Sequence, residues 1–276
     1  MTSPEHGQPP ISAVIITLDA AAGIVDTLAS AAGCAERLVL DSGSTDGTVE
    51  RARAAGARVE FQPFLGYGPQ KRRAVELAAH DWILSLDADE VLDDEAAAAI
   101  RRLDLSDPSA CWSIRRRTFI GRREIRHGPW GGEEVLRLFN RTTAGFTPPA
   151  VHEQVRASQP PRRLPGSILH ASFDTLAAVM NRSIRYAPLK AGVIRAKGQR
   201  LTGWTLPLRG ATAFAKSYCL QGGWRDGSAG FIIALSRVID STLPRAMLLV
   251  GEDENRSATA QRDEHPLDVG RERRGE

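Results

Sequence analysis

Two carboxylates at a spacing of two residues, with a third beside them, follow a short apolar run in the first third of the chain. The apolar run is Trp-Ile-Leu, and the peptide 85–90 after it reads Ser-Leu-Asp-Ala-Asp-Glu. Carboxylates this close repel one another unless a cation or hydrogen-bond donors hold them. Because Mg²⁺ commonly uses one or two carboxylates together with substrate phosphates, Asp87 and Asp89 are candidate metal ligands. The alternative is a charged turn, with Asp93 or Asp94 capping the next helix.

A second loop that suits ligand binding, Asp-Ser-Gly-Ser-Thr-Asp-Gly at residues 41–47, follows another apolar run. Its small residues let the backbone approach a ligand closely, and Gly43 and Gly47 permit positive φ. Asp41 can accept hydrogen bonds from a base or a ribose, while Asp46 can cap the following helix. The loop lacks the Gly-Lys-Ser/Thr ending of a Walker loop, and no Gly-x-Gly-x-x-Gly follows the first strand.

Strand-like and helix-like segments alternate over the first 105 residues. We expect strands at 11–18, 37–40, 57–61 and 82–86, and helices at 20–33, 48–55 and 70–79. This alternation predicts an α/β sandwich with a mostly parallel central sheet, in which ligands lie at the carboxyl ends of the strands. Four carboxylates are expected at that edge: Asp19, Asp41, Asp87 and Asp89.

Further candidate residues come after position 110, where strands are expected at 111–118 and 135–139. Six arginines lie within 115–126 and form either an anion-facing patch or a solvated strand face. Trp130, in a Gly-rich loop, can stack on a sugar or anchor the loop on the core. His152 and Glu153 place an imidazole beside a carboxylate, in either a catalytic or a structural role.

Composition excludes several classes of protein. The chain has 276 residues, 42% hydrophobic and 25% charged, as in an ordinary soluble globular protein. Three widely spaced cysteines form neither a disulfide framework nor a metal motif, which favours a reducing, cytoplasmic location. The N-terminus does not look like a signal peptide, and no apolar run is long enough to span a membrane. A net charge of +3 permits an anionic partner without identifying one.

The chain is expected to divide into four parts. These are a flexible N-terminus at 1–10, an α/β domain at 11–172, a helical extension at 173–250 and a disordered, densely charged tail at 251–276. Aromatic and basic residues alternate in the extension, which indicates either helices at a membrane interface or a helical cap packed on the sheet.

Residues 11–155 resemble family 2 glycosyltransferases of the GT-A fold, in the branch of the bacterial lipopolysaccharide core glucosyltransferases. The resemblance rests on the order and spacing of seven segments. They are Ile-Ile-Thr-Leu at 15–18, Asp-Ser-Gly-Ser-Thr-Asp-Gly-Thr at 41–48, Gln-Lys at 70–71, Asp-Trp-Ile-Leu-Ser-Leu-Asp-Ala-Asp-Glu at 81–90, His-Gly at 127–128, Leu-Arg-Leu-Phe at 136–139 and Val-His-Glu at 151–153.

The resemblance implies a role for each matching residue. Asp41 would hold the uracil or ribose, and Asp87 and Asp89 would serve the Mg²⁺ or Mn²⁺ site. Glu133 would be the catalytic base, with Glu153 beside His152 as second choice, and Trp130 would contact the acceptor. The nucleotide-sugar site would comprise Thr17, Asp19, Asp41, Ser42, Gly43, Lys71, Asp87 and Arg137, with Lys71 and Arg137 neutralising the leaving diphosphate.

The resemblance also implies a reaction. An inverting enzyme would move a hexose, glucose in the leading interpretation, from a UDP-sugar to a cell-envelope glycan or glycolipid at the inner face of the cell membrane. The alternatives are a polyprenyl-phosphate acceptor and a catalytically degenerate homologue. The chain departs from the family at Asp19 and Ala20, where Asn-Glu is usual. A nucleic-acid binder is disfavoured, because four carboxylates at one edge would repel phosphates without a metal.

Overall fold

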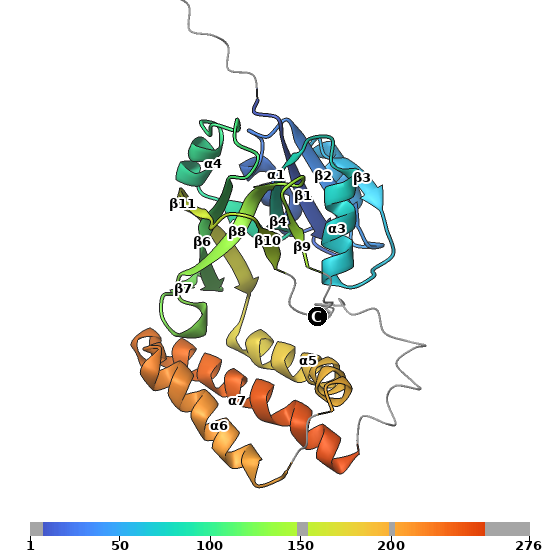
Figure 1. The fold of residues 1–276 in the computed structure, drawn as a ribbon. Coiled ribbons are helices and arrows are strands. Elements are labelled where there is room, and N and C mark those ends of the chain that lie inside the picture. The colour runs from blue at the N-terminus through green and yellow to red at the C-terminus, as the bar shows by residue number, and fades with distance from the viewer. Residues whose placement is uncertain (1–7, 148–153, 199–201, 252–276) are drawn as a thin grey trace, which may run out of the picture. The chain divides into compact units, whose positions relative to one another are not determined.

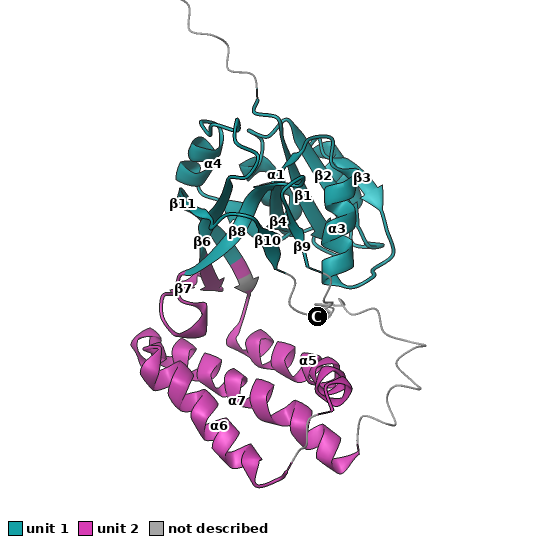
Figure 2. Ribbon diagram, viewed as in Figure 1, with its two compact units in different colours: residues 1–116, 133–170, 267–276 teal, residues 117–132, 171–266 magenta. Residues whose placement is uncertain are grey.

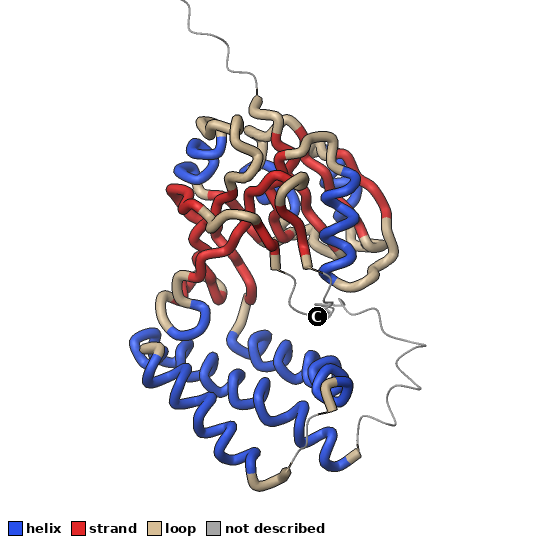
Figure 3. The backbone as a smooth tube through the Cα atoms, viewed as in Figure 1, coloured by secondary structure: helices blue, strands red, loops and turns tan. Residues whose placement is uncertain are grey.

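The computed structural model describes residues 8–147, 154–198 and 202–251, which form two compact units (Figure 1). Unit 1 contains the described residues up to Arg116 and those from Glu133 to His170 (Figure 2). Unit 2 contains Arg117–Gly132 and the described residues from Ala171 onward. Most of the strand residues lie in unit 1, and the long helices lie in unit 2 (Figure 3).

The first half of unit 1 is the parallel α/β arrangement that the sequence predicts. Four parallel strands lie in the order β3-β2-β1-β4. The strands are β1 (Ile11–Thr17), β2 (Glu36–Asp41), β3 (Arg58–Phe61) and β4 (Trp82–Asp87), and the helices between them are α1 (Ile24–Ser30), α2 (Thr48–Ala54) and α3 (Tyr67–Leu77).

Strand β1 is buried on both faces, because its odd-numbered and its even-numbered residues both contribute side chains to the core. Ile11 and Ile15 belong to one apolar cluster of the core, and Val14 belongs to a second cluster. Successive side chains of a strand point to opposite faces, so a continuous β-branched run suits a strand covered on both sides.

Antiparallel strands extend the sheet beyond β4, so the whole sheet is mixed. The order continues β4-β8-β6-β11-β5, and the β4–β8, β8–β6 and β11–β5 pairs are antiparallel. The sequence does not predict β5 or β11. The additional elements are β5 (Glu90–Leu92), α4 (Asp94–Ile100), β6 (Cys111–Ile120), β8 (Glu133–Asn140), β9 (Ala144–Phe146), β10 (Val155–Ala157) and β11 (Arg162–Phe173).

The residue that follows β5 is the predicted helix cap. Asp93 is the N-cap of α4, and its side chain accepts a hydrogen bond of 2.8 Å from the amide of Ala96. This interaction satisfies one of the amides left free at a helix start.

Unit 2 is mainly helical, as the sequence predicts for this region. Helices α5 and α6 each pack against α7. A small core of Ile120, Ile125, Val179, Ala229 and Ile233 holds the unit together. No helix in the described part of the chain is long and apolar enough to cross a bilayer. The elements are β7 (Arg123–Ile125), η1 (Gly128–Trp130), α5 (Leu176–Ala196), α6 (Thr205–Ala215), the π-helical turn η2 (Lys216–Leu220), η3 (Gly223–Asp226) and α7 (Gly227–Val250).

Candidate active site

The carboxyl ends of β1, β2 and β4 meet at one edge of unit 1. Thr17 of β1 is opposite Asp41 of β2, and Ile16 of β1 is opposite Asp87 of β4. Three of the predicted site residues, Thr17, Asp41 and Asp87, are therefore brought to one edge. In an open α/β sheet this edge, outside the carboxyl ends of the strands, is where ligands bind.

The carboxylates of Asp41 and Asp19 both accept hydrogen bonds from backbone amides of the loop 41–47. Asp41 Oδ2 accepts hydrogen bonds from the amides of Gly43 (2.8 Å) and Ser44 (2.9 Å). Asp19 lies in the left-handed region with φ of 48°, and its Oδ1 accepts a hydrogen bond of 2.8 Å from the amide of Thr45. The left-handed conformation is one that Asn and Asp tolerate better than most residues. The loop 41–47 is thus fastened to the end of β1.

The rest of the loop 41–47 is supported from α3. Gln70 is fully buried, and its Nε2 donates to Ser42 Oγ at 3.1 Å and to the Gln62 carbonyl at 3.0 Å. Gly43 has φ of 107°, which favours glycine. Two buried polar atoms near this loop, Thr17 Oγ1 and Gln70 Oε1, have no hydrogen-bond partner within the described residues. Because unsatisfied buried polar groups are unusual, they mark Thr17 and Gln70 as candidate ligand contacts.

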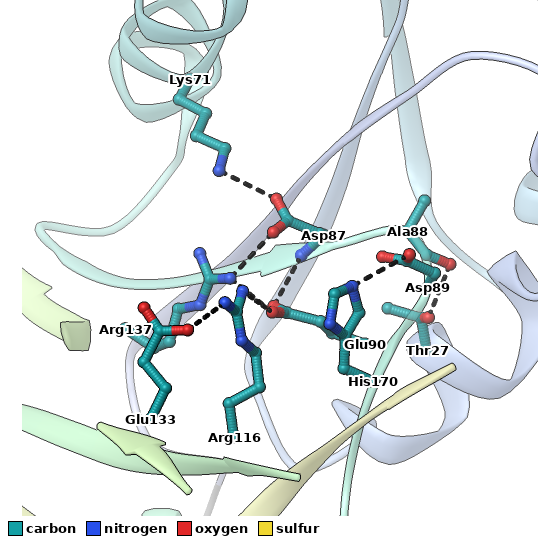
Figure 4. Close-up of polar contacts among 10 residues, drawn as sticks. All are labelled: Thr27, Lys71, Asp87, Ala88, Asp89, Glu90, Arg116, Glu133, Arg137 and His170. Carbon is teal, nitrogen blue, oxygen red and sulfur yellow. Dashed lines mark hydrogen bonds and ion pairs between the residues drawn. The ribbon is translucent and has the colours of Figure 1, made fainter. Parts of the chain in front are cut away.

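Asp87 is held between two cations (Figure 4). Lys71 Nζ lies 2.9 Å from Asp87 Oδ1, and the Arg137 guanidinium lies 2.8 Å from Asp87 Oδ2. Burial alone would raise the pKa of Asp87, but the charges of Lys71 and Arg137 outweigh burial and hold this pKa well below its usual range. Asp87 is therefore ionised, and both of its oxygens already have cationic partners.

The fully buried carboxylate of Glu90 connects the Asp87 clamp, formed by Lys71, Asp87 and Arg137, to the candidate base Glu133. Glu90 Oε1 lies 2.5 Å from the Arg137 guanidinium and 3.6 Å from that of Arg116, and Glu90 Oε2 accepts from the Asp87 amide at 3.1 Å. Arg116 also pairs with Glu133, directly opposite it across the β6–β8 ladder. Charges thus alternate from Lys71 to Glu133 (Figure 4). The sequence does not identify Glu90 or Arg116 as members of this network, although Glu90 lies within the acidic motif and Arg116 within the arginine cluster.

Asp89 points away from this network and faces His170. Asp89 Oδ2 and His170 Nε2 are 3.1 Å apart (Figure 4), with the Asp89 side chain 49% exposed and the His170 side chain 14% exposed. The β5–β11 pairing brings them together, because it sets His170 opposite Glu90. The sequence gives no signal for His170, which is 81 residues away from Asp89.

The Asp89–His170 pair fits a divalent cation better than Asp87 does. A carboxylate oxygen and an imidazole nitrogen are both ordinary ligands of a divalent metal such as Mn²⁺. No group of three or more His, Cys, Asp or Glu residues within the described chain is arranged to hold a metal. A cation at Asp89 and His170 therefore needs further ligands from a substrate or water, as is usual for ions that bind with substrate phosphates.

Several other predicted residues have structural partners or lie outside the described chain. The Trp130 ring stacks on Phe173 with 5.5 Å between centroids, which is the loop-anchor alternative, and its contact with an acceptor stays a prediction. His152 and Glu153 lie outside the described residues.

The arginine cluster is in part neutralised by carboxylates. Arg117 and Arg126 both pair with Glu124. Hydrogen bonds from Arg117, and less strongly from Arg126, lower the pKa of Glu124 to about 2 despite its burial. This part of the cluster is therefore an internal ion-pair network, not an uncompensated anion-facing patch.

Comparison with known proteins agrees with the motifs. Residues 12–160 match the family model described as glycosyl transferase family 2. The chain is 31% identical over 252 residues to the lipopolysaccharide core biosynthesis glycosyltransferase LpsC of Rhizobium meliloti (strain 1021), covering 87% of this chain and 92% of that protein. It is 27% identical over 237 residues to an uncharacterized glycosyltransferase of Rickettsia prowazekii (strain Madrid E), covering 80% of each.

Among solved structures, glucosyl-3-phosphoglycerate synthase from Mycobacterium tuberculosis, in complex with Mn²⁺, UDP and glucosyl-3-phosphoglycerate, is 27% identical. The match covers 40% of this chain and 43% of that chain, with a TM-score of 0.32. A TM-score this low supports no conclusion about the present chain.

Proposed function

Because this chain belongs to glycosyl transferase family 2, we propose that it transfers glucose from UDP-glucose to a cell-envelope glycan or glycolipid, with inversion at the anomeric carbon. The observation that supports this proposal most is the sheet edge of unit 1. There the Asp41 loop, the Asp87 clamp and the Asp89–His170 pair lie at the ends of neighbouring strands.

The donor nucleotide would bind against the loop 41–47. This loop presents small residues, and the unsatisfied oxygens of Thr17 and Gln70 lie beside it. Asp41, Ser42 and Gly43 would set the position of the uridine, and Asp19 would keep the loop in place. UDP-glucose is proposed as donor because the motifs resemble those of the lipopolysaccharide core glucosyltransferases.

Asp89 and His170 would hold Mg²⁺ or Mn²⁺ beside the diphosphate, and this ion would supply Lewis-acid stabilisation of the departing phosphate. This assignment revises the sequence-based proposal of Asp87 and Asp89, because Lys71 and Arg137 already engage both oxygens of Asp87. Lys71 and Arg137 would stabilise the negative charge that develops on the leaving diphosphate.

Glu133 would act as the general base. It would take the proton of the acceptor hydroxyl as that oxygen attacks the anomeric carbon from the face opposite the leaving UDP. The Glu133 side chain is 49% exposed, which leaves it accessible to an acceptor, and Arg116 pairs with it. Glu153 beside His152 is the second proposal for the base.

The acceptor would be a glycan or glycolipid of the cell envelope, such as the lipopolysaccharide core. The similarity to LpsC over most of both chains supports this class of acceptor. Trp130 would contact the acceptor sugar, and the enzyme would meet its acceptor at the inner face of the cell membrane.

Calorimetric titration with UDP, UDP-glucose and GDP-mannose, each in Mn²⁺ and in EDTA, tests the donor and the metal. We expect UDP and UDP-glucose to bind in Mn²⁺ and to lose most of their affinity in EDTA. Equal binding in EDTA would overturn the metal assignment. Binding of none of the three nucleotides would overturn the donor assignment and favour a degenerate homologue.

Two variants locate the metal. Asp89→Asn and His170→Ala should each weaken the Mn²⁺-dependent binding of UDP-glucose, because each removes a ligand. Asp26→Asn, at an exposed residue of α1, is the matched control and should bind as the wild type does. If His170→Ala binds UDP-glucose in Mn²⁺ as the wild type does, His170 is not a metal ligand and the assignment of Asp87 and Asp89 is restored.

A further inference from the structure

The positive charge of the chain is concentrated in the helical part of unit 2. Residues 175–225 contain nine Lys and Arg residues and no Asp or Glu. The chain as a whole has a net charge of only +3, so its other segments balance much of this excess. A segment that carries basic residues and no acidic ones, in a chain of low net charge, indicates a surface that faces an anionic partner.

Helix α6 and the turn η2 leave large apolar side chains in solvent within this basic segment. Trp204, the N-cap of α6, is 94% exposed, Leu208 is 67% exposed and Leu220 is 83% exposed. Between α6 and α7 lies a shallow apolar groove of about 600 Å³, lined by residues such as Leu206 and Phe214. Exposed apolar groups gathered on one surface mark an interaction site more often than single exposed residues do.

The cations beside these apolar groups lack anionic partners. No carboxylate among the described residues forms an ion pair with Arg209, Lys216 or Arg245. Burial, together with the nearby charge of Arg209, lowers the pKa of Arg245, and the Nε of Arg245 is buried without a partner in the described chain. Two guanidinium groups close enough to repel each other would gain from an anion placed beside them.

We propose that the α6 surface, defined by Trp204, Leu208, Arg209, Lys216 and Leu220, binds a lipid bilayer that contains anionic phospholipids. The apolar side chains would enter the boundary between headgroups and acyl chains. Arg209 and Lys216 would contact lipid phosphates. An interfacial helix needs this combination of an apolar face, a terminal aromatic residue and flanking basic residues.

Charge and polarity favour a bilayer over other occupants. A second copy of the chain would present the same basic surface, and the two would repel each other across a symmetric interface. A nucleic acid would satisfy the cations, but it would leave Leu208 and Leu220 exposed, because its backbone offers them no apolar surface. A bilayer with anionic headgroups satisfies both kinds of side chain at once.

Sedimentation of the full chain with lipid vesicles tests the proposal, and no nucleotide or acceptor is needed. We expect binding to vesicles of phosphatidylcholine mixed with phosphatidylglycerol, weak binding to phosphatidylcholine alone, and loss of binding as salt is raised. The pairs Trp204→Ser with Leu208→Ser, and Arg209→Gln with Lys216→Gln, should each weaken binding about tenfold or more.

Matched variants in unit 1 serve as controls. Phe61→Ser with Leu65→Ser removes apolar side chains that are 66% and 58% exposed, and Arg53→Gln with Arg102→Gln removes two exposed charges. These controls should sediment as the wild type does. The proposal would be overturned if the control variants lost as much vesicle binding as the α6 variants do. It would also be overturned if the wild type bound equally well to vesicles with and without phosphatidylglycerol. A dimer in solution that the Trp204 and Leu208 changes dissociate would overturn it as well.

The donor-binding measurement separates this inference from the proposed reaction. The α6 variants should bind UDP-glucose in Mn²⁺ with wild-type affinity, because none of their residues belongs to the sheet edge. Lipid binding without donor binding would overturn the reaction alone, and donor binding without lipid binding would overturn the α6 surface alone.

Discussion

The charged residues around Asp87 in unit 1 and those of the α6 surface in unit 2 differ in how they are paired. In unit 1, Lys71, Asp87, Arg137 and Glu90 are joined in one network, with Glu90 fully buried. In unit 2, Arg209 lies on an exposed helix without a carboxylate partner in the described chain. Side chains that are ion-paired within the protein are held in one position, as a binding site requires. Charged side chains without such a partner can bind a molecule outside the protein.

The largest effect is expected from Glu133→Gln in unit 1, with transfer as the readout. If Glu133 is the base, its loss should slow transfer by about 10²–10⁴-fold and leave the affinity for UDP-glucose unchanged. Initial rates of glucose transfer to a lipopolysaccharide core acceptor measure this loss. The matched control is Glu134→Gln, the next residue, whose carboxylate pairs with Arg163 at 3.2 Å. If Glu133→Gln transfers as fast as Glu134→Gln, the role of base passes to Glu153.

The network of unit 1 should be costly to break at Arg137. Arg137→Gln leaves Asp87 and the buried Glu90 without their shared guanidinium, so the free energy of unfolding should fall by about 3–5 kcal/mol. The control is Arg73→Gln, which breaks a pair with Glu76 whose side chains are 45% and 62% exposed and should cost about 0–1 kcal/mol. Denaturant titration compares the two, and equal losses would show that the network contributes no more than a surface pair.

Acid should remove the contribution of Asp87 to stability. Lys71 and Arg137 hold the pKa of folded Asp87 below its ordinary value, so this contribution is present in full near neutral pH. It declines as the pH falls below the unfolded value of about 4, because the unfolded chain then binds a proton that the folded chain resists. The unfolding midpoints of wild type and Asp87→Asn should therefore converge in acid. A difference between the two midpoints that stays constant as the pH falls would contradict the lowered pKa of Asp87.

The smallest effect is expected in unit 2 from Arg209→Gln. The residue is exposed and has no carboxylate partner among the described residues, so the free energy of unfolding should change by less than about 0.5 kcal/mol. Thermal and denaturant unfolding measure the change. A loss as large as that for Arg137→Gln would show that the charges of the α6 surface also contribute to the stability of the fold.

Much of unit 1 follows from local patterns in the sequence. The β-branched run of β1 and the apolar run of β4 predict buried strands, and their spacing predicts a parallel arrangement. Asp41 and Asp87 consequently reach one edge, because parallel strands in register end together. Asp93 is also predictable, since a helix cap depends on neighbouring residues only.

The partners of these residues are not predictable in the same way. His170 meets Asp89 only because β11 pairs with β5, and β5 is a strand of three residues with almost no pattern of its own. Arg116 meets Glu133 through the β6–β8 register, which shifts between Trp112 and Ser113. Such a shift changes which residues lie opposite one another.

The sequence alone predicts the family motifs, the parallel half of the sheet, the sheet edge that carries the candidate site and the excess of positive charge after residue 174. These features depend on residue type and on short spacings along the chain. The folded chain is needed to show that Lys71 and Arg137 both pair with Asp87, that Asp89 faces His170, and that Trp204 and Leu208 lie in solvent. Those outcomes depend on long-range pairing and on which face of each element the core covers, which no local pattern specifies.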